Sequence, residues 1–159
     1  MTFGEIANNY LNYSIRKCDS HYDMAEMYKN RHRFFGIVVV LVTAIVGTSV
    51  FASLGKSPES WIQIFTGFLS IAAVVLSSLQ TFLGFSEYQS QHKASAAGYG
   101  SCRRDLELLI MKFPEATGKS GEAGTMELEL IKKSLDDLDK ASPTIPDKIW
   151  ASYANEKNI

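Results

Sequence analysis

Charge is absent from two long stretches of this chain, although 16 Lys and Arg and 17 Asp and Glu are present among its 159 residues. The near balance leaves no excess of positive charge, so direct binding of nucleic acid is not expected. Cysteine is scarce as well: Cys18 and Cys102 are the only two, and neither has a second cysteine at metal-ligand spacing. Three scattered histidines do not complete a metal site or a catalytic group. We therefore predict a protein that is not an enzyme, with no metal ion, no cofactor and no catalytic residue.

The two uncharged stretches have the length of membrane spans. Residues 34–54 and 61–86 hold 21 and 26 residues, and a helix that rises about 1.5 Å per residue needs roughly 20 residues to cross a bilayer. Backbone groups in hydrocarbon must be paired within the segment, which predicts a helix for each stretch. Between them, residues 55–60 (GKSPES) combine turn formers with two charges. This pattern predicts a transmembrane helical hairpin. The alternative is a pair of core helices in a soluble four-helix bundle, which the nearly unbroken apolar surface of residues 34–54 disfavours.

Lysine and arginine gather at the ends of the two predicted spans that lie away from the turn. Residues 1–33 contain five, residues 87–113 contain four, and the turn contains one. Cationic residues that flank a span stay on the cytoplasmic side of the membrane. Both chain termini are therefore predicted to be cytoplasmic.

Amphipathic helical patterns occupy much of the chain outside the spans. Apolar and tyrosine residues recur at three- and four-residue steps in residues 1–33, and a similar seam continues the second span without interruption through residues 87–113. Pro114 ends this seam, and residues 115–124 are rich in turn formers. These patterns predict two cytoplasmic helices that extend the spans, followed by a loop.

A third cytoplasmic helix is predicted for residues 125–141. Thr125 is a suitable N-cap, and an apolar stripe repeats along the segment before two prolines end it. Residues 142–159 form a tail whose aromatic residues are expected to dock on the other helices. The predicted fold class is therefore an all-α membrane protein in one domain, a two-helix transmembrane hairpin with long cytoplasmic helical extensions that form a bundle.

The second predicted span carries a stripe of small and polar residues over its full length. Its members recur at steps of three and four: Gln63, Thr66, Ser70, Ala73, Ser77, Thr81 and Gly84. Such a stripe either packs closely against another helix, which the pattern alone favours, or lines a water path formed by several subunits. The first span has a smaller set of this kind, which we assign to helix packing: Gly36, Thr43 and Gly47. Two helices cannot enclose a water path, so pore lining requires a homo-oligomer.

Beyond the second span, Arg103 and Arg104 are assigned to the side of the predicted helix that carries His92 and Tyr99. A guanidinium group binds phosphate through two hydrogen bonds at once, so this side is a candidate contact for an anion such as a nucleotide phosphate. Nearby acidic residues favour the simpler role of solvated or paired surface charges.

Three stretches give the chain a recognisable organisation. They are a basic lead-in to the first span (HYDMAEMYKNRHRFFG, 21–36), a second span that runs into a long helix (FLGFSEYQSQHKASAAGYGSCRRDLELL, 82–109), and a tail with a Pro-x-x-Pro motif (SPTIPDKIW, 142–150). Together they resemble the SLATT domain family, bacterial two-span membrane proteins encoded beside nucleotide-signalling or other antiphage-defence genes. The resemblance implies an inner-membrane effector that assembles and opens a pore. It supplies no catalytic residue, and it favours pore lining for the stripe on the second span.

Two functions follow as hypotheses. The first is a membrane effector of antiphage defence that forms a homo-oligomeric pore or disrupts the inner membrane, causing growth arrest or abortive cell death. The alternative is a membrane anchor or scaffold that recruits a partner enzyme, such as a reverse transcriptase or a nucleotide-signalling protein, through its cytoplasmic helices. The expected partners are the lipid bilayer, further copies of the chain, and a cytoplasmic sensor or enzyme encoded nearby.

Overall fold

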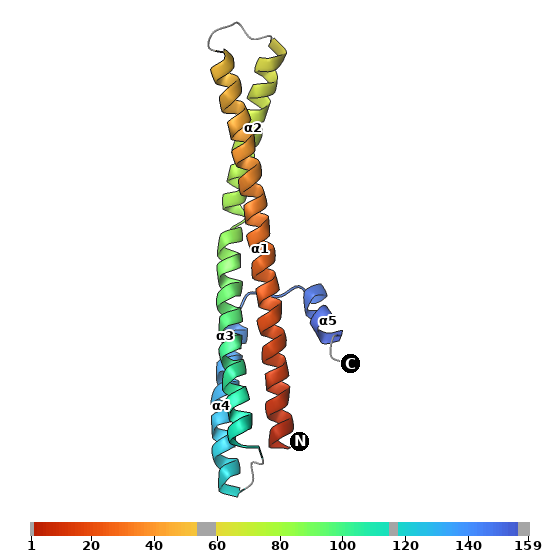
Figure 1. The fold of residues 1–159 in the computed structure, drawn as a ribbon, viewed down its shortest axis with the longest axis vertical. Helices are drawn as coiled ribbons and strands as arrows, with labels where there is room; N and C mark the ends of the chain where they lie inside the picture. Colours follow the sequence, from red (N-terminus) through yellow and green to blue (C-terminus); the bar gives the residue numbers. More distant parts are fainter. Residues whose placement is uncertain (1, 54–59, 115–117, 156–159) are drawn as a thin grey trace. The chain divides into compact units, whose positions relative to one another are not determined.

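The computed structural model describes residues 2–53, 60–114 and 118–155, and in these residues all regular structure is helical (Figure 1). The helices in chain order are α1 (Phe3–Ser53), α2 (Ser60–Phe82), α3 (Phe85–Lys112), α4 (Gly118–Ala141) and α5 (Asp147–Asn155). The predicted all-α class is confirmed. Most of the predicted turn at 55–60, with Leu54 before it, lies outside the described residues.

The chain divides into two compact units, and the prediction of one domain stays a prediction. The bundle unit comprises Met1–Glu26 and Tyr88–Ile159, and the hairpin unit comprises Met27–Glu87. Helix α1 contributes to both, since it continues from Phe3 to Ser53 without a break. This continuity follows from a sequence that has no proline before residue 58.

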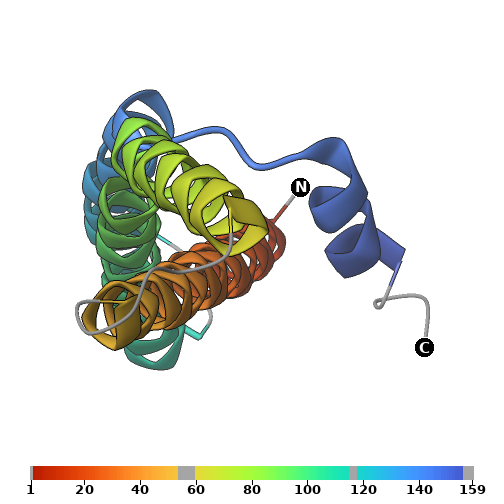
Figure 2. The same cartoon turned by 90° about the horizontal axis from the view of Figure 1, so that it is seen from above.

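The hairpin unit contains the two candidate membrane spans, formed by the second half of α1 and by α2 (Figure 2). Of the most apolar 18-residue windows of these helices, 0% and 6% of the residues are buried. Large apolar side chains instead cover the surface of the hairpin unit; Ile64 is 74% exposed and Phe68 is 70% exposed. An exposed apolar surface of this kind suits lipid and not water. The core of a soluble four-helix bundle is therefore the wrong description of these segments.

A short turn separates α2 from α3, so the uninterrupted helix predicted from the second span to residue 113 is wrong. The turn contains Leu83 and Gly84, and Gly84 has a φ of 57°, which a residue with a side chain adopts only at a cost. Its amide donates to the carbonyl of Thr81 at 3.3 Å, which closes the end of α2. The apolar period continues across the turn in sequence, and for that reason the periodicity does not reveal it.

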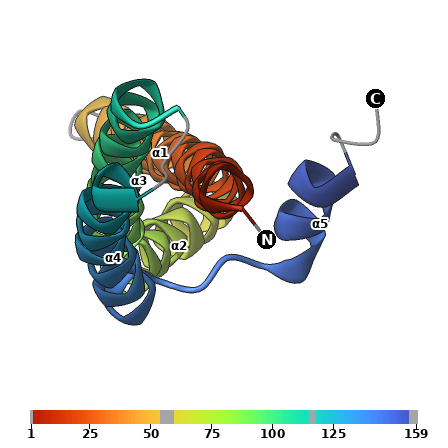
Figure 3. The ribbon, with the colours of Figure 1, turned by 90° about the horizontal axis from the view of Figure 1, so that it is seen from below.

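The bundle unit has its core between α1, α3 and α4, which lie around one another when viewed along the bundle (Figure 3). From His92 to Leu109, each turn of α3 contributes a buried residue from the predicted seam, including Tyr99 and Leu106 at 0% exposure. Helix α4 contributes Leu128 and Leu135, which belong to its predicted stripe. Helix α5 follows an irregular segment and lies on the α1 side of this unit (Figure 3).

Helix α4 begins at Gly118, seven residues before the predicted start at Thr125. Thr125 is not an N-cap: its Oγ1 donates to the carbonyl of Gly121 at 2.8 Å, a bond within a helix that has already begun. Glycines in this stretch lower its intrinsic helix propensity and suggest a loop, but packing overrides that preference. A Cβ on the buried Gly124 would lie 3.2 Å from Phe3 and 3.3 Å from Phe113, so the absence of a side chain lets the helix approach both rings.

Candidate functional site

The polar stripe of the second span straddles the edge of the helix contact inside the hairpin unit. Ala73 is buried, whereas the exposed members are Gln63, Ser77 and Thr81. The remaining members are half-buried: Thr66, Ser70 and Gly84. One edge of the stripe is therefore covered within the hairpin and the other is open.

Two of the stripe's hydroxyl groups, those of Ser70 and Thr81, bond to their own helix. The Oγ of Ser70 donates to the carbonyl of Thr66 at 2.8 Å, and the Oγ1 of Thr81 donates to the carbonyl of Ser77 at 3.2 Å. Such bonds satisfy a hydroxyl in an apolar medium without a partner helix. Contact between the two spans thus does not use these groups, and they need no second helix to be placed in a membrane.

The small residues of the first span behave differently from one another. A Cβ on Gly36 would lie 3.6 Å from the Nε2 of Gln80 on α2, so Gly36 is at the contact between the spans. A Cβ on Gly47 would meet no atom within 4 Å, and Thr43 is exposed, with its hydroxyl bonded to carbonyls of α1. Packing of Thr43 and Gly47 remains a prediction, and it needs a helix from outside this hairpin.

The predicted anion contact is only partly assembled. His92 and Tyr99 are 1% and 0% exposed and face the core, so they do not share a surface with Arg103 and Arg104, and that part of the prediction is wrong. His92, Tyr99 and Arg103 do fall on one side of α3 at about 100° per residue, but α1 and α4 cover that side at His92 and Tyr99, so it is not an open surface. The Nε of Arg103 lies 2.8 Å from the Oε1 of Glu107, with which it forms an exposed ion pair.

The two arginines instead border an open cavity of about 540 Å³ in the bundle unit. Its other lining residues are Cys18, Tyr22, Ala97, Gly100 and Glu107. Burial raises the pKa of the Cys18 thiol, and the two nearby guanidinium groups oppose this rise only in part. The thiol is therefore held in its unreactive protonated form. Binding of an anion at Arg103 and Arg104 stays a prediction.

Sequence reasoning missed a buried histidine pair in the bundle unit. The Nδ1 atoms of His21 and His92 are 2.8 Å apart, and the two rings are 0% and 1% exposed. One Nδ1 must donate and the other accept, so the accepting ring is neutral. Burial, followed by the neighbouring His92 and Lys17, lowers the pKa of His21 to about 4, and burial also lowers the pKa of His92. Both residues belong to amphipathic helices, but no pattern within one helix reveals which residue on the other it will meet.

A second polar cluster, the Asp139 cluster, joins three helices of the same unit. The carboxylate of Asp139 accepts hydrogen bonds from Tyr13 at 2.6 Å and Tyr99 at 2.7 Å, and Lys17 lies 3.0 Å away. Burial works against the charge of Asp139, but these three partners together hold its pKa below the usual value. Burial and the adjacent carboxylate raise the pKa of both tyrosines. The cluster therefore carries a stable anion that ties α1, α3 and α4 together, and Tyr99 also stacks on His21 with ring centroids 5.4 Å apart.

Helix α5 docks beside this cluster through its aromatic residues. The ring of Trp150 meets Tyr13 edge to face at 6.2 Å between centroids, and the Nζ of Lys17 lies 5.4 Å from the Trp150 ring centroid. The hydroxyl of Tyr153 donates to Asp23 on α1. An open cavity of about 410 Å³ remains between the tail and the Asp139 cluster.

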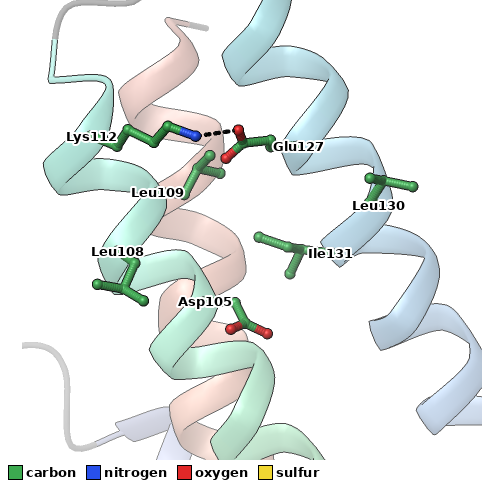
Figure 4. Close-up of a pocket in the computed structure, with 7 residues that line it drawn as sticks. All are labelled: Asp105, Leu108, Leu109, Lys112, Glu127, Leu130 and Ile131. Atoms are coloured by element: carbon green, nitrogen blue, oxygen red, sulfur yellow. Dashed lines mark hydrogen bonds and ion pairs between the residues drawn. The ribbon is translucent and has the colours of Figure 1, made fainter.

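A groove with a volume of about 550 Å³ lies between α3 and α4, and leucine and isoleucine side chains form much of its lining (Figure 4). Leu109 and Ile131 point into the space between the helices, and Lys112 and Glu127 form an ion pair across it. At its margins, Leu108 is 60% exposed and Leu130 is 64% exposed. These leucines lie off the predicted seams. The groove offers apolar contact and no groups arranged for bond making or breaking.

No three His, Cys, Asp or Glu side chains come together as metal ligands would in the part of the chain that the structure describes. The chain matches no curated protein and no solved structure. The model of the SMODS and SLOG-associating 2TM effector domain family 4 matches residues 11–147, which include both long apolar stretches and most of the bundle core. The match confirms the resemblance that the sequence suggested. With its two long apolar helices and a match over most of its length, the chain belongs to this family of two-transmembrane effector domains.

Proposed function

We propose that this protein is a membrane effector of a bacterial antiphage defence system, of which several copies assemble in the inner membrane and make it leak to ions. Membership of a family of effector domains with two transmembrane helices supports the effector role. The observation that carries the pore is the open edge of the stripe on α2, where Gln63, Ser77 and Thr81 are exposed within an apolar span.

This open edge favours assembly for a physical reason. Gln63 is costly in contact with hydrocarbon, and the hydroxyl groups of Ser77 and Thr81 gain little from such contact. Another polar surface or water is a better environment for all three. One hairpin cannot enclose water, so a ring of hairpins would place these edges toward a common axis.

The proposed topology places both termini and the bundle unit in the cytoplasm, because cationic residues flank the spans at the ends away from the turn. A cytoplasmic bundle is in a position to receive the signal of infection and to control assembly. Leakage of ions through the inner membrane would then stop growth or kill the infected cell.

Membrane potential after induced expression in bacteria tests the proposal. The informative variant is Ser77→Leu, and Ser78→Leu is its matched control, because both serines are exposed and adjacent positions differ by about 100° around a helix. We expect the wild type and Ser78→Leu to depolarise the membrane and Ser77→Leu to leave the potential intact, at equal amounts of protein in the membrane.

Equal depolarisation by all three proteins would show that the stripe on α2 does not line the conducting path. Silence of all three, even in infected cells, would count against a pore. The alternative role, a scaffold that recruits a partner enzyme, would then take its place, and the exposed apolar groove between α3 and α4 is the observation that favours it.

A further inference from the structure

An open pocket of about 340 Å³ lies on the hairpin unit where the charged lead-in of α1 meets its first apolar turns. It has a polar end formed by His32, Arg33 and Gln80, and an apolar wall formed by the next two turns of α1. The apolar wall comprises Gly36, Ile37, Val40 and Leu41. The two kinds of surface therefore follow one another along the direction in which α1 enters the membrane.

The polar end has the groups that bind a phosphate ester. Arg33 is exposed and immediately precedes the uncharged run, which sets its guanidinium group at the level of the lipid headgroups. The Nδ1 of His32 is enclosed and has no hydrogen-bond partner among the described residues. The amide of Gln80 borders the same pocket from α2 and offers a further donor. Arginine binds phosphate oxygens through its planar fork, so Arg33 is the main candidate for the charged contact.

The apolar wall fits an acyl chain. Ile37, Val40 and Leu41 are 53%, 65% and 58% exposed, and they lie between about 6 and 12 Å along the helix from Arg33 at a rise of about 1.5 Å per residue. Gly36 leaves the wall open between the polar and apolar parts, because any side chain there would begin 3.6 Å from the Gln80 amide. A ligand with a phosphate at one end and hydrocarbon at the other would satisfy both parts at once.

We propose that this pocket is a binding site for an anionic phospholipid, with the headgroup phosphate at Arg33 and His32 and an acyl chain along Ile37, Val40 and Leu41. Charge selects the class of lipid, because the exposed Arg33 at the polar end of the pocket favours a headgroup that carries no amine. A second copy of the same surface fits less well, since a two-fold contact would bring Arg33 against its own counterpart.

Native mass spectrometry of the full-length protein in detergent tests the site by titration with phosphatidylglycerol or phosphatidylcholine. The variant is Arg33→Gln. Arg31→Gln is the matched control, because it removes the same charge from an exposed residue that does not line the pocket. We expect the wild type to prefer phosphatidylglycerol. We expect Arg33→Gln to weaken that binding by about fivefold, which corresponds to about 1 kcal/mol for one cationic residue at a membrane surface, and Arg31→Gln to change it little.

Further measurements make each outcome decisive. Gly36→Leu fills the pocket and should lower binding of both lipids, and size-exclusion elution of each variant verifies that it is folded. Equal loss in the two arginine variants would show general surface attraction and overturn the site, as would equal binding of the two lipids by the wild type. The lipid assignment would be wrong if inorganic phosphate bound the protein as well as the lipid did. It would also be wrong if Arg33→Gln altered only the number of associated chains.

Discussion

The two units of this protein use the same long helix in opposite ways. In the bundle unit α1 buries polar side chains: Ser14 and His21 are both 0% exposed and both bond to α3. In the hairpin unit α1 exposes its apolar side chains, and Val40 is 65% exposed. Water outside the bundle drives apolar groups inward and rewards a few satisfied polar contacts, whereas lipid outside the hairpin removes that driving force. Stability of the bundle unit should therefore depend on particular core contacts, and stability of the hairpin unit on backbone hydrogen bonds within each helix.

The largest expected effect is that of Leu106→Ala in the bundle unit. Leu106 is 0% exposed, so its truncation should lower the free energy of opening of α3 by about 2–5 kcal/mol, the usual cost of a cavity in a core. Hydrogen exchange of α3 amides in detergent measures this quantity. Leu108→Ala is the matched control, because Leu108 is on the same helix and 60% exposed, and it should stay within about 0.5 kcal/mol of the wild type. Similar losses for both would mean that the groove next to Leu108 is covered in the folded protein.

A smaller effect is expected from pH, and it should be confined to the bundle unit. The pKa of His21 is lowered to about 4, so the folded state binds fewer protons than the unfolded state between that value and the ordinary value of about 6.5. The contribution of His21 to the free energy of unfolding is therefore complete above pH 6.5 and is lost as the pH falls toward 4. At pH 5 the loss should be about 1–2 kcal/mol.

Hydrogen exchange of α3 at pH 7 and pH 5, corrected for the intrinsic exchange rate, tests this prediction, and His21→Gln should flatten the difference. An unchanged difference in His21→Gln would assign the pH dependence to another group. Loss of protection in α2 at pH 5 would contradict the separation of the two units.

The smallest expected effects test the comparison most directly, because one serine is substituted in the bundle unit and one in the hairpin unit. The Oγ of Ser14 is buried and donates to the carbonyl of Tyr99 on α3 at 2.9 Å, so Ser14→Ala should cost about 0.5–1.5 kcal/mol. The Oγ of Ser70 bonds within α2, so Ser70→Ala should change the free energy of unfolding by less than about 0.5 kcal/mol. If Ser70→Ala were the more damaging of the two, the hydroxyl would have a role between chains that one hairpin does not display.

The sequence predicts those parts of the fold that depend on one helix at a time. The uncharged runs indicate the two spans, and the three- and four-residue periods indicate the buried faces of α3 and α4, because burial of one face leaves its mark at regular spacing. The start of α4 is missed, since the glycines that suggest a loop serve close packing of Gly124 against Phe3 and Phe113. The turn at Gly84 is missed because its φ of 57° leaves the apolar period intact.

The candidate sites follow the same division. The stripe on α2 is visible in the sequence, but which edge the first span covers is not. The histidine pair and the Asp139 cluster are not visible in the sequence. Both depend on the register between helices that are far apart in the chain. The grouping of Arg103 and Arg104 with His92 fails for the related reason that α1 packs over His92, which the period of α3 alone does not reveal.

The turn at Gly84 has a mechanical consequence. Along α1, an unbroken ladder of backbone hydrogen bonds resists twisting from Phe3 to Ser53, so a rotation applied at one end is carried to the other. Along the second leg, the ladder is interrupted between α2 and α3, and the backbone of a glycine offers little resistance to rotation. The chain thus passes into its apolar hairpin through one continuous helix and leaves it through a turn that contains a glycine with positive φ.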